Sequence, residues 1–149
     1  VSQLEYIGLN PGLSGNWWGG SDRSGEGFLV EVANSSGALV LIGSFYTYSP
    51  EGSQIFLIAV GAADGSMETD VTFYITDGQK WGTDLDPNDP ERSEVEFGTG
   101  TFTFPACDVG HVSITPNATF MGRGYGEIAY DLSRDITEYK VACPSLVLD

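Results

Sequence analysis

The sequence predicts a single-domain, nearly all-β protein. Its apolar runs are short and are separated by Gly, Asn, Asp, Ser and Pro, as in chains of strands joined by turns. Helical periodicity is almost absent, and 149 residues is a usual size for one domain. We therefore expect an antiparallel meander of about eight strands closed into a barrel, with a two-sheet sandwich as the alternative.

The first fourteen residues precede the expected domain. Residues 1–14 mix isolated apolar residues with Gly and Pro and show no clean period, so we expect an extended N-terminal arm there. Residues 15–149 form the single β domain in this division. The continuously apolar residues 39–42 predict a strand segment covered on both faces, by the arm or by another subunit.

Turn signals divide the rest of the chain into strands. Residues 34–37, 49–52 and 63–66 carry the Asn, Asp, Pro and Gly that β-turns prefer. The expected strands are residues 27–33, 38–48, 54–61, 67–76, 95–104, 110–115, 124–131 and 138–143. Residues 77–94 are polar and exceed the usual length of a connection, which indicates a functional or a flexible loop.

The charge of the chain disfavours some partners. Asp and Glu number 21 against six Lys and Arg, which gives a formal net charge of −15. Such a field repels phosphate backbones and anionic lipids, and the basic residues form no stripe, so we expect no nucleic-acid partner. No stretch approaches the roughly 20 apolar residues that cross a bilayer, so we expect no membrane insertion.

Cysteine usage indicates an oxidising compartment. Cys107 and Cys143 lie outside any C-x-x-C arrangement, and the single histidine cannot complete a zinc site with them. A disulfide between them is the simpler interpretation. Together with Val1, which no Met precedes, it predicts a processed, secreted protein, extracellular or at the cell surface, with the periplasm as the alternative.

The chain shows no established catalytic motif, so we expect that it is not an enzyme. His111 is the only histidine, and Cys107 in a disulfide would not act as its nucleophile. Paired carboxylates are the one catalytic format that the composition supplies, and Asp22, Glu26 and Glu31 are the candidates for a glycosidase acid and base. Acidic residues beside Gly turns are more often surface solubilisers.

The most suggestive local feature is an acidic stretch inside the long loop. Oxygen ligands at alternate positions can wrap a Ca²⁺ ion, which is the one cofactor that the sequence suggests. The candidate metal ligands are Asp84, Asp86, Asn88, Asp89 and Glu91. The turn glycine and the flanking helices of an EF-hand are missing, and a solvated acidic loop is the alternative.

A second feature is a set of aromatic residues beside glycines and turns. Their faces can stack on the sugar rings of a glycan or on another protein. The candidate ligand-binding residues are Trp18, Tyr46, Tyr48 and Trp81. Trp17 and Trp18 are adjacent, so in a strand one would point into the core and the other outward.

Several short motifs resemble a poorly characterised family of secreted bacterial β-domains. The family patterns G-x-W-Y, S-G-E-G-F and F-T-Y-D are matched by Gly15-Asn16-Trp17-Trp18, Ser24-Gly25-Glu26-Gly27-Phe28 and Tyr46-Thr47-Tyr48. Ser49 stands in place of the turn aspartate of the family. The resemblance implies export and a disulfide from Cys107 to Cys143, and it implies no activity. Avidin-like and lipocalin-like barrels, which also open on G-x-W and run as meanders, are similar in architecture.

These observations favour a non-catalytic extracellular structural or adhesive module that self-assembles through its N-terminal arm into a homo-oligomer or polymer. The first alternative is a monomeric module that binds a glycan or a small apolar ligand through exposed aromatics or the barrel mouth. The second alternative is the carboxylate-dependent glycosidase.

Overall fold

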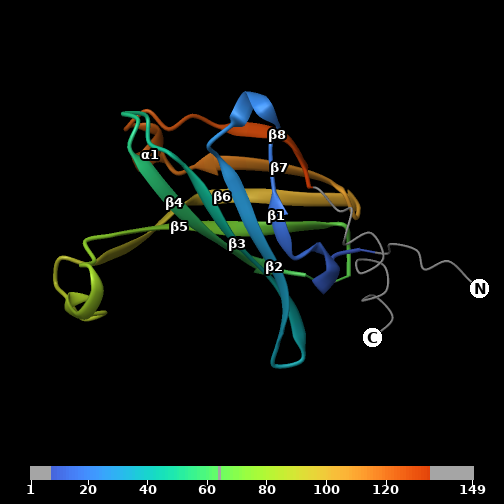
Figure 1. The fold of residues 1–149 in the computed structure, drawn as a ribbon, viewed down its shortest axis with the longest axis horizontal. Helices are drawn as coiled ribbons and strands as arrows, with labels where there is room; N and C mark the ends of the chain where they lie inside the picture. The colour runs from blue at the N-terminus through green and yellow to red at the C-terminus, as the bar shows by residue number, and fades with distance from the viewer. Residues whose placement is uncertain (1–7, 64, 135–149) are drawn as a thin grey trace, which may run out of the picture.

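Eight antiparallel strands form one sheet in which every strand pairs with its neighbours in the sequence (Figure 1). The computed structural model describes residues 8–63 and 65–134. Its strands are β1 (Gly15–Trp17), β2 (Gly27–Ser35), β3 (Ala38–Tyr48), β4 (Gln54–Ala62), β5 (Glu68–Asp77), β6 (Ser93–Ala106), β7 (Val109–Pro116) and β8 (Ile128–Ser133). The predicted all-β meander is confirmed, and one continuous sheet stands in place of the two-sheet alternative.

Alternation along the strands places one face of the sheet in the core. In β2, Phe28 and Val30 are buried, whereas Leu29 between them is exposed. Phe28 stacks on Phe45 of β3 with ring centroids 4.1 Å apart, and its edge meets Phe102 of β6 at 5.3 Å. Because β2 and β6 are not neighbours in the sheet, this contact crosses the interior, as in a sheet that curls on itself.

The two ends of the sheet meet at a short seam between β1 and β8. Trp18 and Ser133 form an antiparallel bridge in which each backbone N–H donates to the other residue's carbonyl at 2.8 Å. β1 is only three residues long, so backbone pairing contributes little to the closure. Side chains at both ends of the seam therefore matter for keeping the barrel closed.

The segment before β1 closes one end of the barrel. Asn10 caps the 3₁₀ helix η1 (Pro11–Leu13), because its side-chain oxygen accepts a hydrogen bond from a backbone N–H of that turn at 2.8 Å. Leu9 and Leu13 are buried in the core. Residues 8–14 thus differ from the expected extended arm, since the Asn-Pro cap favours a turn and the two leucines gain burial by folding back.

Arg134 joins the N-terminal segment, residues 8–14, to the end of β8. Its guanidinium donates to the carbonyls of Gly12 at 2.7 Å and Ser14 at 3.2 Å, and to the Cys107 carbonyl at 2.9 Å. The same group lies over the Trp17 ring, 4.7 Å from its centroid, in a cation–π contact. The Arg134 side chain therefore joins the N-terminal segment, β1 and the turn after β6.

Some predicted elements differ from the observed ones. β1 was not expected, because three residues are too few to show an alternating pattern. The strand predicted for residues 124–131 begins at Ile128, after Gly124 with a φ of 97° and a short helix, α1 (Ala118–Met121). The strand predicted for residues 138–143 lies outside the described residues.

No element among the described residues covers the outer side of residues 39–42, and the expected cover by another subunit stays a prediction. Leu41 is buried, whereas Ile42 is exposed on the outer side of β3. On the outer side of the barrel, Ile42 lies beside its register neighbour Val60 of β4. A continuous apolar run here marks an apolar outer surface, and alternation still decides which side chains enter the core.

Cys107 is half-buried in the turn between β6 and β7. Its expected partner, Cys143, lies outside the described residues, so the disulfide stays a prediction. Within residues 8–63 and 65–134, no helix has the length and apolar character needed to cross a bilayer.

Candidate functional site

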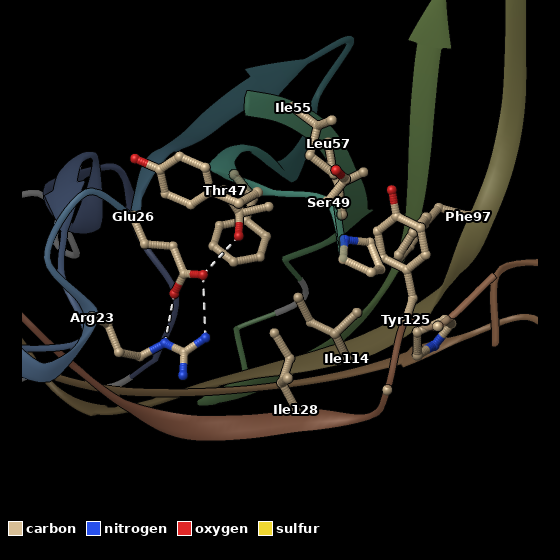
Figure 2. A pocket seen from close by; sticks show the side chains of 16 residues that line it. Arg23, Glu26, Thr47, Ser49, Ile55, Leu57, Phe97, Ile114, Tyr125 and Ile128 are labelled. Atoms are coloured by element: carbon tan, nitrogen blue, oxygen red, sulfur yellow. Dashed lines mark hydrogen bonds and ion pairs between the residues drawn. The ribbon is translucent and has the colours of Figure 1, made fainter. Parts of the chain in front are cut away.

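A cavity of about 230 Å³ lies at the end of the barrel opposite η1 (Figure 2). The turn between β3 and β4 and the connection from β7 to β8 border it, and both lie at the upper left in Figure 1, with η1 at the right. The barrel is therefore closed at one end by its own N-terminal segment and hollowed at the other.

The inward positions of four strands supply most of the apolar wall. Alternation places Ile55 and Leu57 of β4 on the inner side, and it does the same for Phe45 of β3. Ile114 and Ile128 of β7 and β8 complete this part of the wall, as Figure 2 shows. Aliphatic and aromatic surface of this kind favours apolar ligand atoms.

A bulge in β6 turns Phe97 into the cavity wall. The β5–β6 register shifts at Phe73 and Tyr74, so Phe97 has no register partner on β5 and is buried. Phe97 packs against Phe120 of α1 at 4.8 Å and against Tyr125 at 5.1 Å between ring centroids. These three rings hold the connection from β7 to β8 against the barrel.

Asn117 anchors the same connection through polar contacts. Its side-chain oxygen accepts from the Phe120 N–H at 3.1 Å and caps α1, while its side-chain amide donates to the Glu96 carbonyl at 2.8 Å. Its own backbone N–H donates to the Phe97 carbonyl at 2.8 Å. The wall of the cavity is thus ordered by local hydrogen bonds as well as by ring packing.

Glu26 organises the polar side of the cavity. Its carboxylate accepts from Arg23 Nε at 2.5 Å and Arg23 Nη2 at 3.2 Å. It also accepts from the Thr47 hydroxyl of β3 at 2.6 Å and from the Tyr130 hydroxyl of β8 at 3.0 Å. The side chain of Glu26 is only 13% exposed. Four donors from η2 (Ser21–Arg23), β3 and β8 therefore converge on one half-enclosed carboxylate.

The surroundings of Arg23 and Tyr130 raise the pKa of both groups. The hydrogen bond that Arg23 donates to Glu26 is the main cause that raises the pKa of the Arg23 guanidinium, against an opposing effect of burial. Burial, followed by the negative charge of Glu26, raises the pKa of the Tyr130 hydroxyl. Arg23 also lies 4.0 Å above the Tyr130 ring. At neutral pH the Arg23 guanidinium therefore stays charged and the Tyr130 hydroxyl stays protonated.

This arrangement does not resemble a pair of catalytic carboxylates. An ionised carboxylate offers about four acceptor positions, and the four hydrogen bonds to Glu26 occupy them. Asp22 is exposed within η2, and Glu31 is exposed on the outer side of β2, away from the cavity. The chemistry that the described geometry supports is the positioning of hydrogen-bonding groups beside an apolar surface.

The structure brings two of the four predicted ligand-binding aromatics to this end of the barrel. Tyr48 lines the cavity, and Tyr46 lies beside it, with its ring 6.4 Å from that of Phe56. Trp18 is exposed at the seam, whereas Trp17 is buried. Trp81 is 95% exposed in the loop between β5 and β6 and is not part of the cavity lining.

The predicted calcium ligands are not gathered around one point. Asp86 accepts from the Asn88 N–H and Asp89 accepts from the Glu91 N–H, both at 2.9 Å, so these carboxylates stabilise local turns. Asp89 also pairs with Lys80 at 3.1 Å. In the part of the chain that the structure describes, no three His, Cys, Asp or Glu residues form a group that could hold a metal. The calcium expectation therefore gains no support.

Sequence reasoning missed the polar partners of Glu26. Arg23, Thr47 and Tyr130 belong to three separate segments, and Tyr130 is 104 positions from Glu26. One signal was present: Thr47 is the polar residue in an inward series with Leu41, Gly43 and Phe45, and it lies between the outward Tyr46 and Tyr48. A polar residue at such a position indicates a hydrogen-bonded site near the barrel end.

Comparisons with known proteins leave the family of the chain open. The likeness to secreted bacterial β-domains thus stays a prediction, as do export and a location outside the cell. No family model, no curated protein and no solved structure matches this chain.

Proposed function

We propose that the protein is a binding module that holds a small, largely apolar ligand in the cavity at the open end of its barrel. The observation that supports this function is one ordered polar network, centred on Glu26, beside the apolar wall of an open cavity. Ligand sites combine these two features, because apolar surface gives affinity and a few fixed polar groups give orientation. The small volume restricts the ligand to a single ring or a short chain.

The experiment fills the cavity and compares the result with a matched change on the same strand. Ile55 and Ile58 are both half-buried in β4, but Ile55 faces the cavity and Ile58 faces outward. Ile55→Trp should abolish binding of 4-methylphenol, whereas Ile58→Trp should leave it unchanged. Titrations followed by NMR chemical shifts of the isoleucine methyl groups measure the affinity, which we expect in the millimolar to micromolar range for about eight non-hydrogen atoms.

Two results would contradict the proposal. One is a lack of shift changes at Ile55, Ile114 and Ile128 when 4-methylphenol is added in excess. The other is equal affinity of the Ile55→Trp and Ile58→Trp variants, which would place the bound ligand elsewhere. Circular dichroism of both variants confirms that the barrel is folded.

A second candidate function, self-association, has support from the outer face of β2, β3 and β4. Leu29, Ile42, Phe56 and Val60 are exposed on this face. Glu31 is the one charged residue among the outward positions of the three described strands, in a chain with a net charge of −15. The acidic surface elsewhere on the chain repels a second copy, whereas the outer face of β2, β3 and β4 repels it least. This face, rather than the N-terminal arm, is the surface that we propose for a homodimer.

Sedimentation velocity over a range of concentrations tests the dimer. The wild-type chain should show a concentration-dependent dimer, and Ile42→Glu should shift it to monomer because it places two like charges in the interface. Thr99→Glu, on the outer side of β6, is the control and should leave the dimer intact. A wild-type monomer at every concentration would refute self-association.

A further inference from the structure

The charges at the cavity cancel each other. Among the described residues that line it, Arg23 and Glu26 are the only charged ones, and their side chains meet at 2.5 Å. The carboxylate has no acceptor position left for a ligand cation, because Arg23, Thr47 and Tyr130 fill all four. The positive charge of Arg23 is already matched by the Glu26 carboxylate. A charged ligand would therefore meet no unpaired counter-charge in the cavity.

The rest of the lining makes a ligand charge costly. The wall around the ion pair consists mainly of Phe45, Ile55, Leu57, Phe97, Ile114 and Ile128. A carboxylate or an ammonium group that enters such surroundings loses its hydration, and without a partner that loss is not offset. An anion is further opposed by the field of a chain with a net charge of −15.

Neutral hydrogen-bonding groups are available at the border of the cavity. Ser49 and Tyr125, which both carry a hydroxyl group, line it, and Figure 2 shows Tyr125 on the side opposite Glu26. Burial raises the pKa of the Tyr125 hydroxyl, with a smaller effect of Glu51, so this group remains a donor at neutral pH. Within residues 8–63 and 65–134, the Tyr125 hydroxyl makes no hydrogen bond, which leaves it available to a ligand oxygen.

We propose that the cavity selects uncharged ligands that carry one hydrogen-bonding oxygen on a compact apolar body, such as phenols, cyclic alcohols and ketones, and that it rejects carboxylates and amines of the same shape. The volume of about 230 Å³ accommodates about eight non-hydrogen atoms when compared with the space that a molecule of liquid water occupies. This inference rests on the proposed function and states its selectivity.

Three probes with one ring system test the selection: 4-methylphenol, 4-methylbenzoate and 4-methylbenzylamine at neutral pH. NMR titration of the wild-type chain should give at least a tenfold higher affinity for 4-methylphenol than for either charged probe. Equal or tighter binding of a charged probe at Ile55, Ile114 and Ile128 would overturn the selectivity and leave the proposed function standing. Failure of all three probes would contradict the proposed function, and the selectivity with it.

Two variants identify the side chains that determine the selectivity for uncharged ligands. Glu26→Gln removes the charge that matches Arg23, so 4-methylbenzoate should gain at least tenfold in affinity relative to 4-methylphenol. Tyr125→Phe should weaken 4-methylphenol severalfold and leave toluene, which has no oxygen, unchanged. If the relative affinity for 4-methylbenzoate stays the same in folded Glu26→Gln, charge pairing with Arg23 is not the cause of the selectivity. If Glu26→Gln does not fold, Tyr125→Phe still tests whether a hydrogen bond to the ligand oxygen contributes to the affinity.

Discussion

At the scale of single residues, two arginines hold the seam of the barrel at opposite ends. Arg23 pairs with Glu26 at the open end and covers the Tyr130 ring of β8. Arg134 donates to the Gly12 and Ser14 carbonyls of the N-terminal segment and covers the Trp17 ring of β1. Each combines charge-assisted hydrogen bonds with an aromatic face, a pairing that suits the planar guanidinium. These contacts compensate for the single backbone bridge between β1 and β8.

Because of Tyr130, we expect the stability of the protein to fall at alkaline pH. Its pKa in the fold is raised above the ordinary value of 10.0, mainly by burial. Above about pH 10 the unfolded chain releases this proton while the folded chain keeps it, so the free energy of unfolding falls by up to about 1.4 kcal/mol per pH unit. Urea denaturation between about pH 8 and about pH 11 measures the slope, which Tyr130→Phe should make less steep. An identical slope in Tyr130→Phe would contradict this assignment.

Arg134 is expected to contribute strongly to stability. Arg134→Met removes three hydrogen bonds to carbonyls and the contact with Trp17, so the free energy of unfolding should fall by about 3 kcal/mol. Urea denaturation followed by tryptophan fluorescence measures the loss. Arg92→Met is the matched control: Arg92 pairs with the half-exposed Glu94, and its loss should cost less than about 1 kcal/mol. Equal effects of the two variants would refute the role of Arg134.

At the scale of elements, β6 shapes the open end through its bulge and its glycines. A Cβ on Gly98 would lie 2.2 Å from the Thr115 carbonyl oxygen and 2.7 Å from the Pro116 Cα, both backbone atoms of β7. The close approach of β6 and β7 at this point therefore requires glycine. It also sets where Phe97, the residue before Gly98, enters the cavity wall.

Gly98→Ala should cost about 2 kcal/mol or more, because backbone of β7 must move to admit the methyl group. Gly126→Ala is the control, since a Cβ there meets no atom within 4 Å among the described residues. Thermal unfolding by circular dichroism compares the two variants. Similar melting temperatures for both would show that the β6–β7 contact relaxes freely.

The loop between β5 and β6 is a self-contained element. Asp86 and Asp89 cap turns inside it, and the Lys80–Asp89 ion pair ties its two sides together. Trp81 projects from it into solvent and lies outside the cavity lining. Trp81→Ala should therefore change neither the melting temperature nor the affinity for 4-methylphenol. A severalfold loss of affinity would place Trp81 in the binding site after all.

At the scale of the whole molecule, the excess of acidic groups opposes the compact state. A net charge of −15 on 149 residues produces self-repulsion that folding intensifies. Raising NaCl from about 20 mM to about 500 mM screens this repulsion and should raise the melting temperature by several degrees. Differential scanning calorimetry measures the shift. A melting temperature that falls with salt would show that the described ion pairs outweigh the repulsion.

Local patterns predicted those parts of the barrel that depend on neighbours in the sequence. The hairpin of β2 and β3 is an example: Ser36 and Gly37, with φ of 55° and 88°, form the two-residue turn between the strands, and Asn34 accepts from the Gly37 N–H. The paths of β1 and η1 were not predictable, because a three-residue strand and a single turn carry too weak a period.

The sequence by itself determined the fold class, most strand positions and the acidic character, because alternation, turn residues and charge are local properties. Only the tertiary structure decided which residues meet at the open end. Glu26 faces Tyr130 across the seam, 104 positions away in the chain, since closure of the barrel brings the first and last described strands together. No local pattern encodes that contact, whereas burial of one common core requires it.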